Sequence, residues 1–153
     1  MYYGDSLSLI PWANESDDNP VAAKCWILGD SLRCKEFKNH AMDRIHSTHV
    51  CNTFPAVSFT LPLKSNEFRY VYENSRADSM LRKFYIDFLL QNFTSQGNLQ
   101  GTVEEWDEVL QSYDDARLLL LQRLRMSSHE ITQCIKSKEE YYENDQGSTS
   151  ACE

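Results

Sequence analysis

The sequence predicts an all-α protein, a small irregular bundle of about five to seven helices with a disordered C-terminal tail. Apolar residues recur at three- and four-residue spacing through most of the 153 residues. Only 5 Gly and 4 Pro interrupt the chain, so long helices are possible. Strand-type alternation is confined to a weak candidate over residues 57–63. A hydrophobic fraction of 41% is that of a folded chain.

Asn19 and Pro20 predict the start of the first helix, because Asn can accept a hydrogen bond from the free amides and Pro needs no donor at the first position. Residues at helical spacing give this helix one apolar face: Val21, Cys25, Leu28 and Leu32. A second helix is expected over residues 35–47. Its inner side would hold Phe37, Ala41, Met42 and Ile45.

An extended connector is expected over residues 48–64. Ser65 is then expected to cap a short helix that runs through Asn74, and a longer helix should cover residues 79–93. The inner faces of these two helices are predicted to contain Phe68, Val71, Tyr72, Leu81, Phe84, Tyr85, Phe88 and Leu89.

Thr102 and Glu105 have the spacing of a capping box, which satisfies two backbone donors at a helix start. The helix that follows should bury Trp106, Val109 and Leu110. A last helix is expected over residues 113–126, including the run from Leu118 to Leu121 and also Leu124. Residues 129–142 should extend it or form a separate helix, and residues 143–153 should be disordered.

The charge of the chain limits its partners. Its formal net charge is -8 and its Lys and Arg residues form no basic stripe, which predicts no nucleic-acid binding and no binding to anionic membranes. No signal peptide or apolar run of membrane-spanning length is expected. Five cysteines without a Cys-x-x-Cys pair fit a compartment where thiols stay reduced. We therefore expect a cytoplasmic or nuclear protein whose partners are proteins.

Two stretches of the sequence resemble the fungal BTB/POZ domain-containing proteins. Residues 24–43, KCWILGDSLRCKEFKNHAMD, are similar to the last two helices of the BTB/POZ domain, and Tyr2-Tyr3-Gly4 resembles the end of the helix before them. Residues 68–87, FRYVYENSRADSMLRKFYID, resemble the helical segment that follows that domain. The resemblance spans roughly the first 95 residues and rests on the order and spacing of several common motifs.

The resemblance implies a domain organisation. Residues 1–50 would be a remnant of the C-terminal BTB/POZ helices, residues 51–142 a BACK-like helical region, and residues 143–153 a tail. The strands and first helices of a BTB domain have no counterpart, which predicts a fragment, a truncated gene product or a divergent relative. The resemblance implies an adaptor linked to substrate recruitment by cullin-type ubiquitin ligases. Its partners would be a cullin or, in the full-length form, a second copy of the same protein.

Partner contacts are predicted at six residues, chosen because aromatic residues and Arg dominate binding hot spots and because apolar helix faces need a cover. They are Trp26, Leu28, Phe37, Tyr70, Tyr72 and Arg82. The competing interpretation is core filling for the aromatic residues and a solvated helix face for Arg82.

The sequence predicts no enzyme, no metal and no cofactor. His129-Glu130 begins like a zinc-protease motif, but Gln133 stands where the second histidine is needed. Zinc ligands are dense among Cys34, His40, His46, His49 and Cys51, although their spacing matches no structural zinc motif. We therefore expect a protein-interaction module. The alternatives are a zinc-binding regulatory helical protein and a truncated gene product without independent function.

Overall fold

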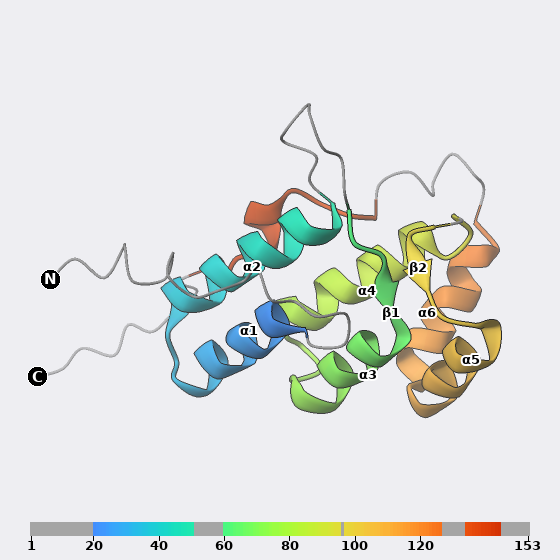
Figure 1. Ribbon diagram of the computed structural model, residues 1–153, viewed down its shortest axis with the longest axis horizontal. Helices are drawn as coiled ribbons and strands as arrows, with labels where there is room; N and C mark the ends of the chain where they lie inside the picture. Colours follow the sequence, from blue (N-terminus) through green and yellow to red (C-terminus); the bar gives the residue numbers. More distant parts are fainter. Residues whose placement is uncertain (1–19, 51–59, 96, 127–133, 145–153) are drawn as a thin grey trace, which may run out of the picture.

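The computed structural model describes residues 20–50, 60–95, 97–126 and 134–144 (Figure 1). Within these ranges the chain forms six α-helices, a 3-10 helix and one short parallel sheet, which confirms the predicted helical bundle. The elements are α1 (Val21–Ser31), α2 (Lys35–His49), β1 (Leu63–Lys64), α3 (Ser65–Asn74), α4 (Met80–Asn92), β2 (Leu99–Gln100), α5 (Val103–Ser112), α6 (Asp114–Leu124) and η4 (Lys138–Tyr141).

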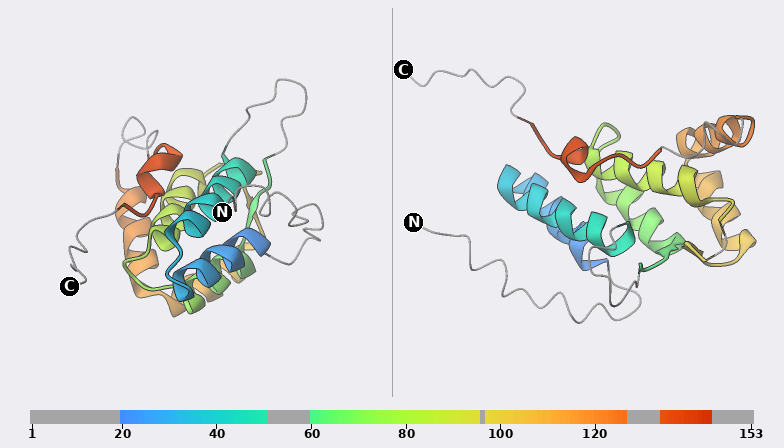
Figure 2. Two further views of the ribbon diagram at one scale, coloured as in Figure 1. Left: turned by 90° about the vertical axis from the view of Figure 1, so that its left-hand side faces the viewer. Right: turned by 90° about the horizontal axis from the view of Figure 1, so that it is seen from above.

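The bundle is elongated, with α1 and α2 at one end, α5 and α6 at the other, and α4 between them (Figures 1 and 2). One cluster of buried side chains runs through it, from Ala22 in α1 to Tyr141 in η4. The two predicted regions, residues 1–50 and 51–142, therefore both contribute to the same core. The predicted cap Asn19 and most of the predicted tail lie outside the described residues. Within the tail, the Glu143 amide donates to Asn39 Oδ1 at 2.9 Å.

The predicted inner faces of α3, α4 and α5 are confirmed. Every residue that the sequence assigned to them is buried. On α2, Ala41, Met42 and Ile45 are buried, whereas Phe37 is half-buried. The strong period of apolar residues in these helices therefore identifies the side that faces the core.

The predicted inner face of α1 is wrong. Its buried residues are Ala22, Ala23, Trp26 and Gly29, whereas Leu28 and Leu32 are 51% and 65% exposed. The physical reason is the space available between α1 and α2. A helix with alanine and glycine on its inner side can approach its neighbour more closely than one with leucine there.

Gly29 marks the point of closest approach. A Cβ added at this residue would lie 2.9 Å from Lys38 Cγ and 3.2 Å from the Lys38 backbone nitrogen. The chain turns between the two helices at Arg33, whose φ of 53° is in the left-handed region. The first residue of α2 follows only two positions later.

The starts of α2, α4 and α5 agree with the sequence, whereas those of α1 and α3 differ. Pro20, expected as the first helical residue, is the N-cap of α1. Ser79 caps α4, since its Oγ accepts from the Arg82 amide at 3.2 Å. The capping box of α5 is confirmed, with Glu105 N to Thr102 Oγ1 at 3.2 Å and Thr102 N to Glu105 Oε2 at 2.8 Å. Ser65 is not a cap, because β1 leads directly into α3 and the N-cap is Lys64.

The short sheet ties the connector before α3 to the loop before α5. Leu63 pairs with Leu99 and Lys64 with Gln100 in parallel register. Leu63, which ends the weak strand candidate, is fully buried. Because β1 precedes α3 and β2 precedes α5, the pairing holds the starts of these two helices near each other.

Candidate interaction surface

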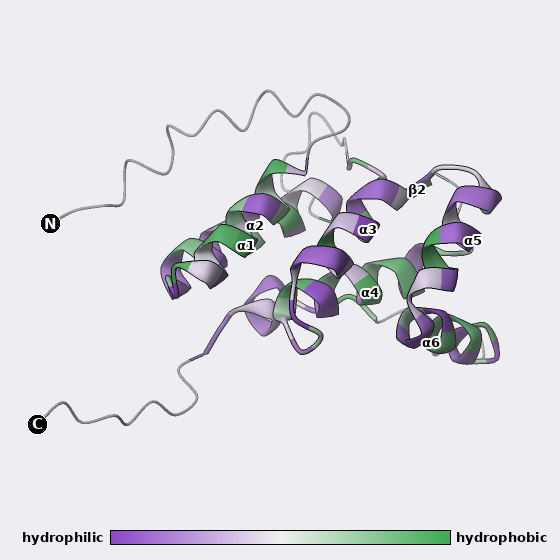
Figure 3. Ribbon diagram, turned by 90° about the horizontal axis from the view of Figure 1, so that it is seen from below, coloured by the Kyte–Doolittle hydropathy of each residue, from purple (hydrophilic) through white to green (hydrophobic). Residues whose placement is uncertain are grey.

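A row of leucines lies exposed along α6. Leu118, Leu121 and Leu124 follow at three-residue spacing and are 57%, 54% and 49% exposed; we call them the α6 ridge. Figure 3 shows α6 at the edge of the molecule, with apolar residues over much of its length. Residues three apart on a helix are neighbours, so these side chains form a continuous apolar strip.

The turn between α5 and α6 sets this orientation. Tyr113 is both the C-cap of α5 and the N-cap of α6, with φ of -132° and ψ of 87°. The buried residues of α6 are Ala116, Leu120 and Arg123. Because one alanine, one leucine and one arginine face the bundle, most of the leucines in α6 are directed away from it.

Charged residues border the α6 ridge at both ends. Asp114 accepts from Arg117 Nη2 at 2.8 Å, and the Asp114 side chain is 85% exposed. Arg125, the C-cap residue, is also exposed. An acidic N-terminus and a basic C-terminus suit the helix dipole. The surface thus combines an apolar centre with charged ends.

A second apolar surface lies at the other end of the bundle. Leu28 and Leu32 are on the outer side of α1, one helical turn apart. A polar hollow of about 380 Å³ borders the α1–α2 corner and is lined by Asp30, Arg33, Lys35, Lys38, Arg76, Glu143 and Asn144. Lys38 Nζ lies 2.9 Å from Asp30 Oδ1 and 3.3 Å from Glu143 Oε1. These ion pairs join α1, α2 and the segment after η4.

The six predicted partner contacts are separated by the fold. Trp26 and Tyr72 are buried in the core, which corrects their assignment as partner contacts, since a buried ring offers no surface to another protein. Phe37 and Tyr70 are half-buried, and Lys24 Nζ lies 5.5 Å from the centre of the Tyr70 ring. Leu28 is exposed, as a partner contact requires, and its binding role stays a prediction.

Arg82 is engaged within the chain. Its guanidinium donates to the backbone carbonyls of Tyr72 and Ser75, the second at 2.7 Å. It also lies 4.6 Å over the Tyr72 ring. These carbonyls lie at the C-terminal end of α3, where backbone carbonyls have no N–H partner within the helix. The structure therefore places Arg82 at the joint between α3 and α4, and its role as a partner contact stays a prediction.

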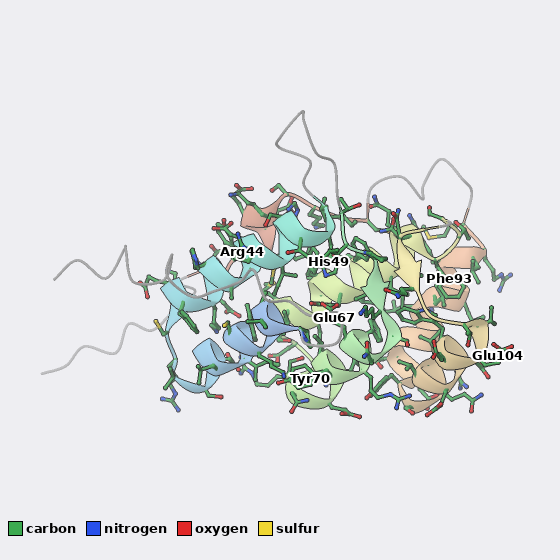
Figure 4. The ribbon with its side chains drawn as sticks, in the orientation of Figure 1. Arg44, His49, Glu67, Tyr70, Phe93 and Glu104 are labelled. Carbon is green, nitrogen blue, oxygen red and sulfur yellow. The ribbon has the colours of Figure 1, made fainter. Side chains whose placement is uncertain are left out.

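A buried polar cluster joins α2, α3 and α4. His49 Nδ1 lies 2.9 Å from the Leu61 carbonyl oxygen, and His49 Nε2 lies 3.3 Å from Glu67 Oε1 (Figure 4). Tyr85 Oη donates to the same Glu67 oxygen at 2.5 Å. Both ring nitrogens of His49 therefore lie within hydrogen-bond distance of a protein oxygen, which argues against His49 as a zinc ligand.

The remaining candidate zinc ligands are Cys34, His40, His46 and Cys51. His46 Nε2 lies 3.3 Å from the Lys136 carbonyl oxygen, and Cys51 is outside the described residues. Among the residues that the structure describes, no three His, Cys, Asp or Glu side chains are arranged to hold a metal ion.

A second buried polar cluster links α4 to η4. Tyr141 Oη donates to Asp87 Oδ2 at 2.9 Å and accepts from the Lys136 amide at 3.0 Å. Burial raises the pKa of Asp87 above its ordinary value, although the hydrogen bond from Tyr141 acts in the opposite direction. Burial also raises the pKa of Cys25, which disfavours the thiolate that a nucleophile requires. Both polar clusters satisfy their own groups and join helices.

The sequence alone did not reveal the partners in either cluster. Glu67 and Asp87 lie on amphipathic helices, where a carboxylate usually faces water. Tyr141 was expected within a charged helical segment, yet it is fully buried. The available signal for the burial of Tyr141 was that it is an aromatic residue among charged neighbours.

None of the helices in the described part of the chain combines the length and apolar character needed to cross a lipid bilayer. The resemblance to BTB/POZ proteins stays a prediction. Searches against family models, curated proteins and solved structures gave no significant match to this chain.

Proposed function

We propose that this chain is a helical protein-interaction module that binds another polypeptide through the α6 ridge. The supporting observation is the outward orientation of Leu118, Leu121 and Leu124, on a helix whose inward face includes a buried arginine. Contiguous exposed apolar side chains on a soluble domain mark interaction sites. The charged ends of α6 supply the polar rim that surrounds the apolar centre of such sites.

The energy available at the α6 ridge suits reversible binding. Full burial of a leucine side chain contributes about 1.5–3 kcal/mol, so covering three half-exposed leucines contributes about 2–4.5 kcal/mol before the cost of association. That gain is too small for tight binding by itself. The ridge would therefore act as the centre of a wider contact that includes its charged neighbours.

The test is binding by the full chain and two matched double variants. Leu118→Gln with Leu121→Gln removes the centre of the α6 ridge, and Leu32→Gln with Leu61→Gln removes two leucines of comparable exposure elsewhere on the surface. We expect the immobilised wild-type chain to bind a partner protein. We expect only the α6 variant to lose this binding. Capture that is unchanged in the α6 variant would contradict the proposal.

The more specific proposal is an adaptor of the BTB type that serves a cullin-type ubiquitin ligase in the cytoplasm or nucleus. It is supported by the resemblance of residues 24–43 and 68–87 to the helices of those proteins. Binding of the purified full chain to a purified cullin N-terminal region, measured by calorimetry, would support it. Absence of binding would remove the cullin proposal and leave the interaction module.

A further inference from the structure

The outer side of α6 carries a pattern that extends beyond its leucines. Four residues follow one another at spacings of four, three and four positions: Asp114, Leu118, Leu121 and Arg125. At about 100° per residue they fall within an arc of about 60°. The buried residues of α6 lie on the opposite side of the helix. The four residues therefore form one outward-facing strip.

This spacing is that of the contact positions in a coiled coil, and the strip has a symmetrical order of residue types. It has an acid at one end, a base at the other and two leucines between. If a second α6 packs antiparallel to the first, Leu118 of each copy meets Leu121 of the other. Asp114 of each copy then meets Arg125 of the other. The two-fold axis passes midway between Leu118 and Leu121.

We propose that a second copy of this chain covers Leu118 and Leu121 of the α6 ridge, in a two-fold symmetric antiparallel pair of α6 helices. This inference rests on the proposed function and names its partner. Charge complementarity selects the antiparallel arrangement, because parallel helices would bring Asp114 beside Asp114 and Arg125 beside Arg125. A two-fold contact uses the same surface on both copies, and this strip is complementary to itself.

The groups that this contact needs are accessible. The Asp114 side chain is 85% exposed, and its ion pair with Arg117 lies on the same outer surface, so it can be shared with a second cation. Arg125 is exposed at the opposite end. Both further views show α6 at the periphery of the bundle (Figure 2).

The size of the contact sets its expected strength. An 11-residue helix is about 16 Å long, so two such helices bury less than a standard protein interface. The formal net charge of -8 on each copy adds repulsion, which physiological salt screens over about 8 Å. We therefore expect a weak and reversible dimer.

Sedimentation equilibrium of the full chain between about 5 and 500 µM tests for a weak, reversible dimer. We expect a monomer–dimer equilibrium that Leu118→Gln or Leu121→Gln weakens at least about tenfold. The matched control Leu32→Gln removes a comparably exposed leucine at the other end of the bundle and should leave the equilibrium unchanged. A monomer at every concentration, or equal weakening by the control, would overturn the proposal.

Charge reversal tests the antiparallel register. Asp114→Arg and Arg125→Asp should each weaken the dimer, because each brings like charges together at both ends. An equimolar mixture of the two variants should dimerise like the wild type, since every pair then has opposite charges. The mixture contains the same two chains, so damage to folding cannot explain its recovery. A mixture no stronger than either variant alone would refute this register.

The two proposals fail in different ways. A chain that remains monomeric and still captures another protein through the α6 ridge would overturn the dimer and leave the proposed function standing. A chain that dimerises through the strip supports both. Far-UV circular dichroism of each variant confirms that the helices are retained.

Discussion

Replacement of Arg82 should destabilise the joint between α3 and α4. Its guanidinium donates to two carbonyls at the end of α3, those of Tyr72 and Ser75, and lies over the Tyr72 ring. A hydrogen bond from a charged group contributes about 1.5–3 kcal/mol and a cation–π contact about 0.5–1 kcal/mol. Because Arg82 is half-buried and solvent can replace part of these interactions, we expect Arg82→Ala to lower the free energy of unfolding by about 2–3 kcal/mol.

Urea unfolding followed by far-UV circular dichroism measures this loss. Arg82→Lys should recover only part of it, since an ammonium lacks the planar fork that reaches both carbonyls. Arg69→Ala is the matched control. Arg69 pairs with Glu108 at 3.0 Å on the exposed surface, so its loss should cost less than about 1 kcal/mol. If Arg82→Ala destabilised no more than Arg69→Ala, the assigned role of Arg82 would be refuted.

Three further substitutions test other joints. Gly29→Ala should lower the free energy of unfolding by about 1–3 kcal/mol despite a better helix propensity, because the new Cβ crowds Lys38; thermal unfolding that shows stabilisation would contradict this. Thr102→Ala should cost about 1 kcal/mol, and Glu105→Ala should add little to it, since both belong to one capping box; additive losses in a double-mutant cycle would exclude the reciprocal bonds. The pKa of Asp87 is raised in the folded state, so the folded state holds this proton more tightly than the unfolded state does. The resulting stability is fully present below about pH 3.8 and is lost as the pH rises through the folded-state pKa. Asp87→Asn should remove this loss of stability. If the free energy of unfolding depended on pH equally in the wild type and in Asp87→Asn, the role given to Asp87 would be contradicted.

The helices whose orientation could be predicted have an unbroken apolar period. In α4 the residues predicted to face inward follow at three- and four-residue spacing or beside one another, and all of them are buried: Leu81, Phe84, Tyr85, Phe88 and Leu89. The same holds for α5, where Trp106, Val109 and Leu110 define one side. A single apolar stripe leaves one possible orientation against a core, so periodicity is sufficient.

Periodicity failed where apolar residues occupy more than one side. Four consecutive leucines, from Leu118 to Leu121, give α6 no preferred face, and only Leu120 is buried. In α1 the leucines favoured one side and the small residues the other. Packing selected the small side because α2 approaches closely at Gly29. Side-chain volume and neighbouring helices decided both cases, and neither is readable from hydropathy.

The polar clusters could not be predicted for a different reason. Asp87 and Tyr141 are separated by 54 positions, and His49 and Glu67 by 18. Local spacing carries no information about such pairs. A carboxylate on an amphipathic helix has the same sequence appearance whether it faces water or a buried hydroxyl, so only the tertiary structure distinguishes the two.

The distribution of polar and apolar groups connects these findings to function. Two partly buried carboxylates are engaged in holding helices together: Glu67 between His49 and Tyr85, and Asp87 at Tyr141. Chemistry at these groups would require breaking contacts on which the fold depends. The α6 ridge is the reverse case, because the bundle gains nothing from leucines that face water and loses nothing when another chain covers them. Association can therefore use the α6 ridge without disturbing the core, which is why we propose the α6 ridge, rather than a buried cluster, as the site of function.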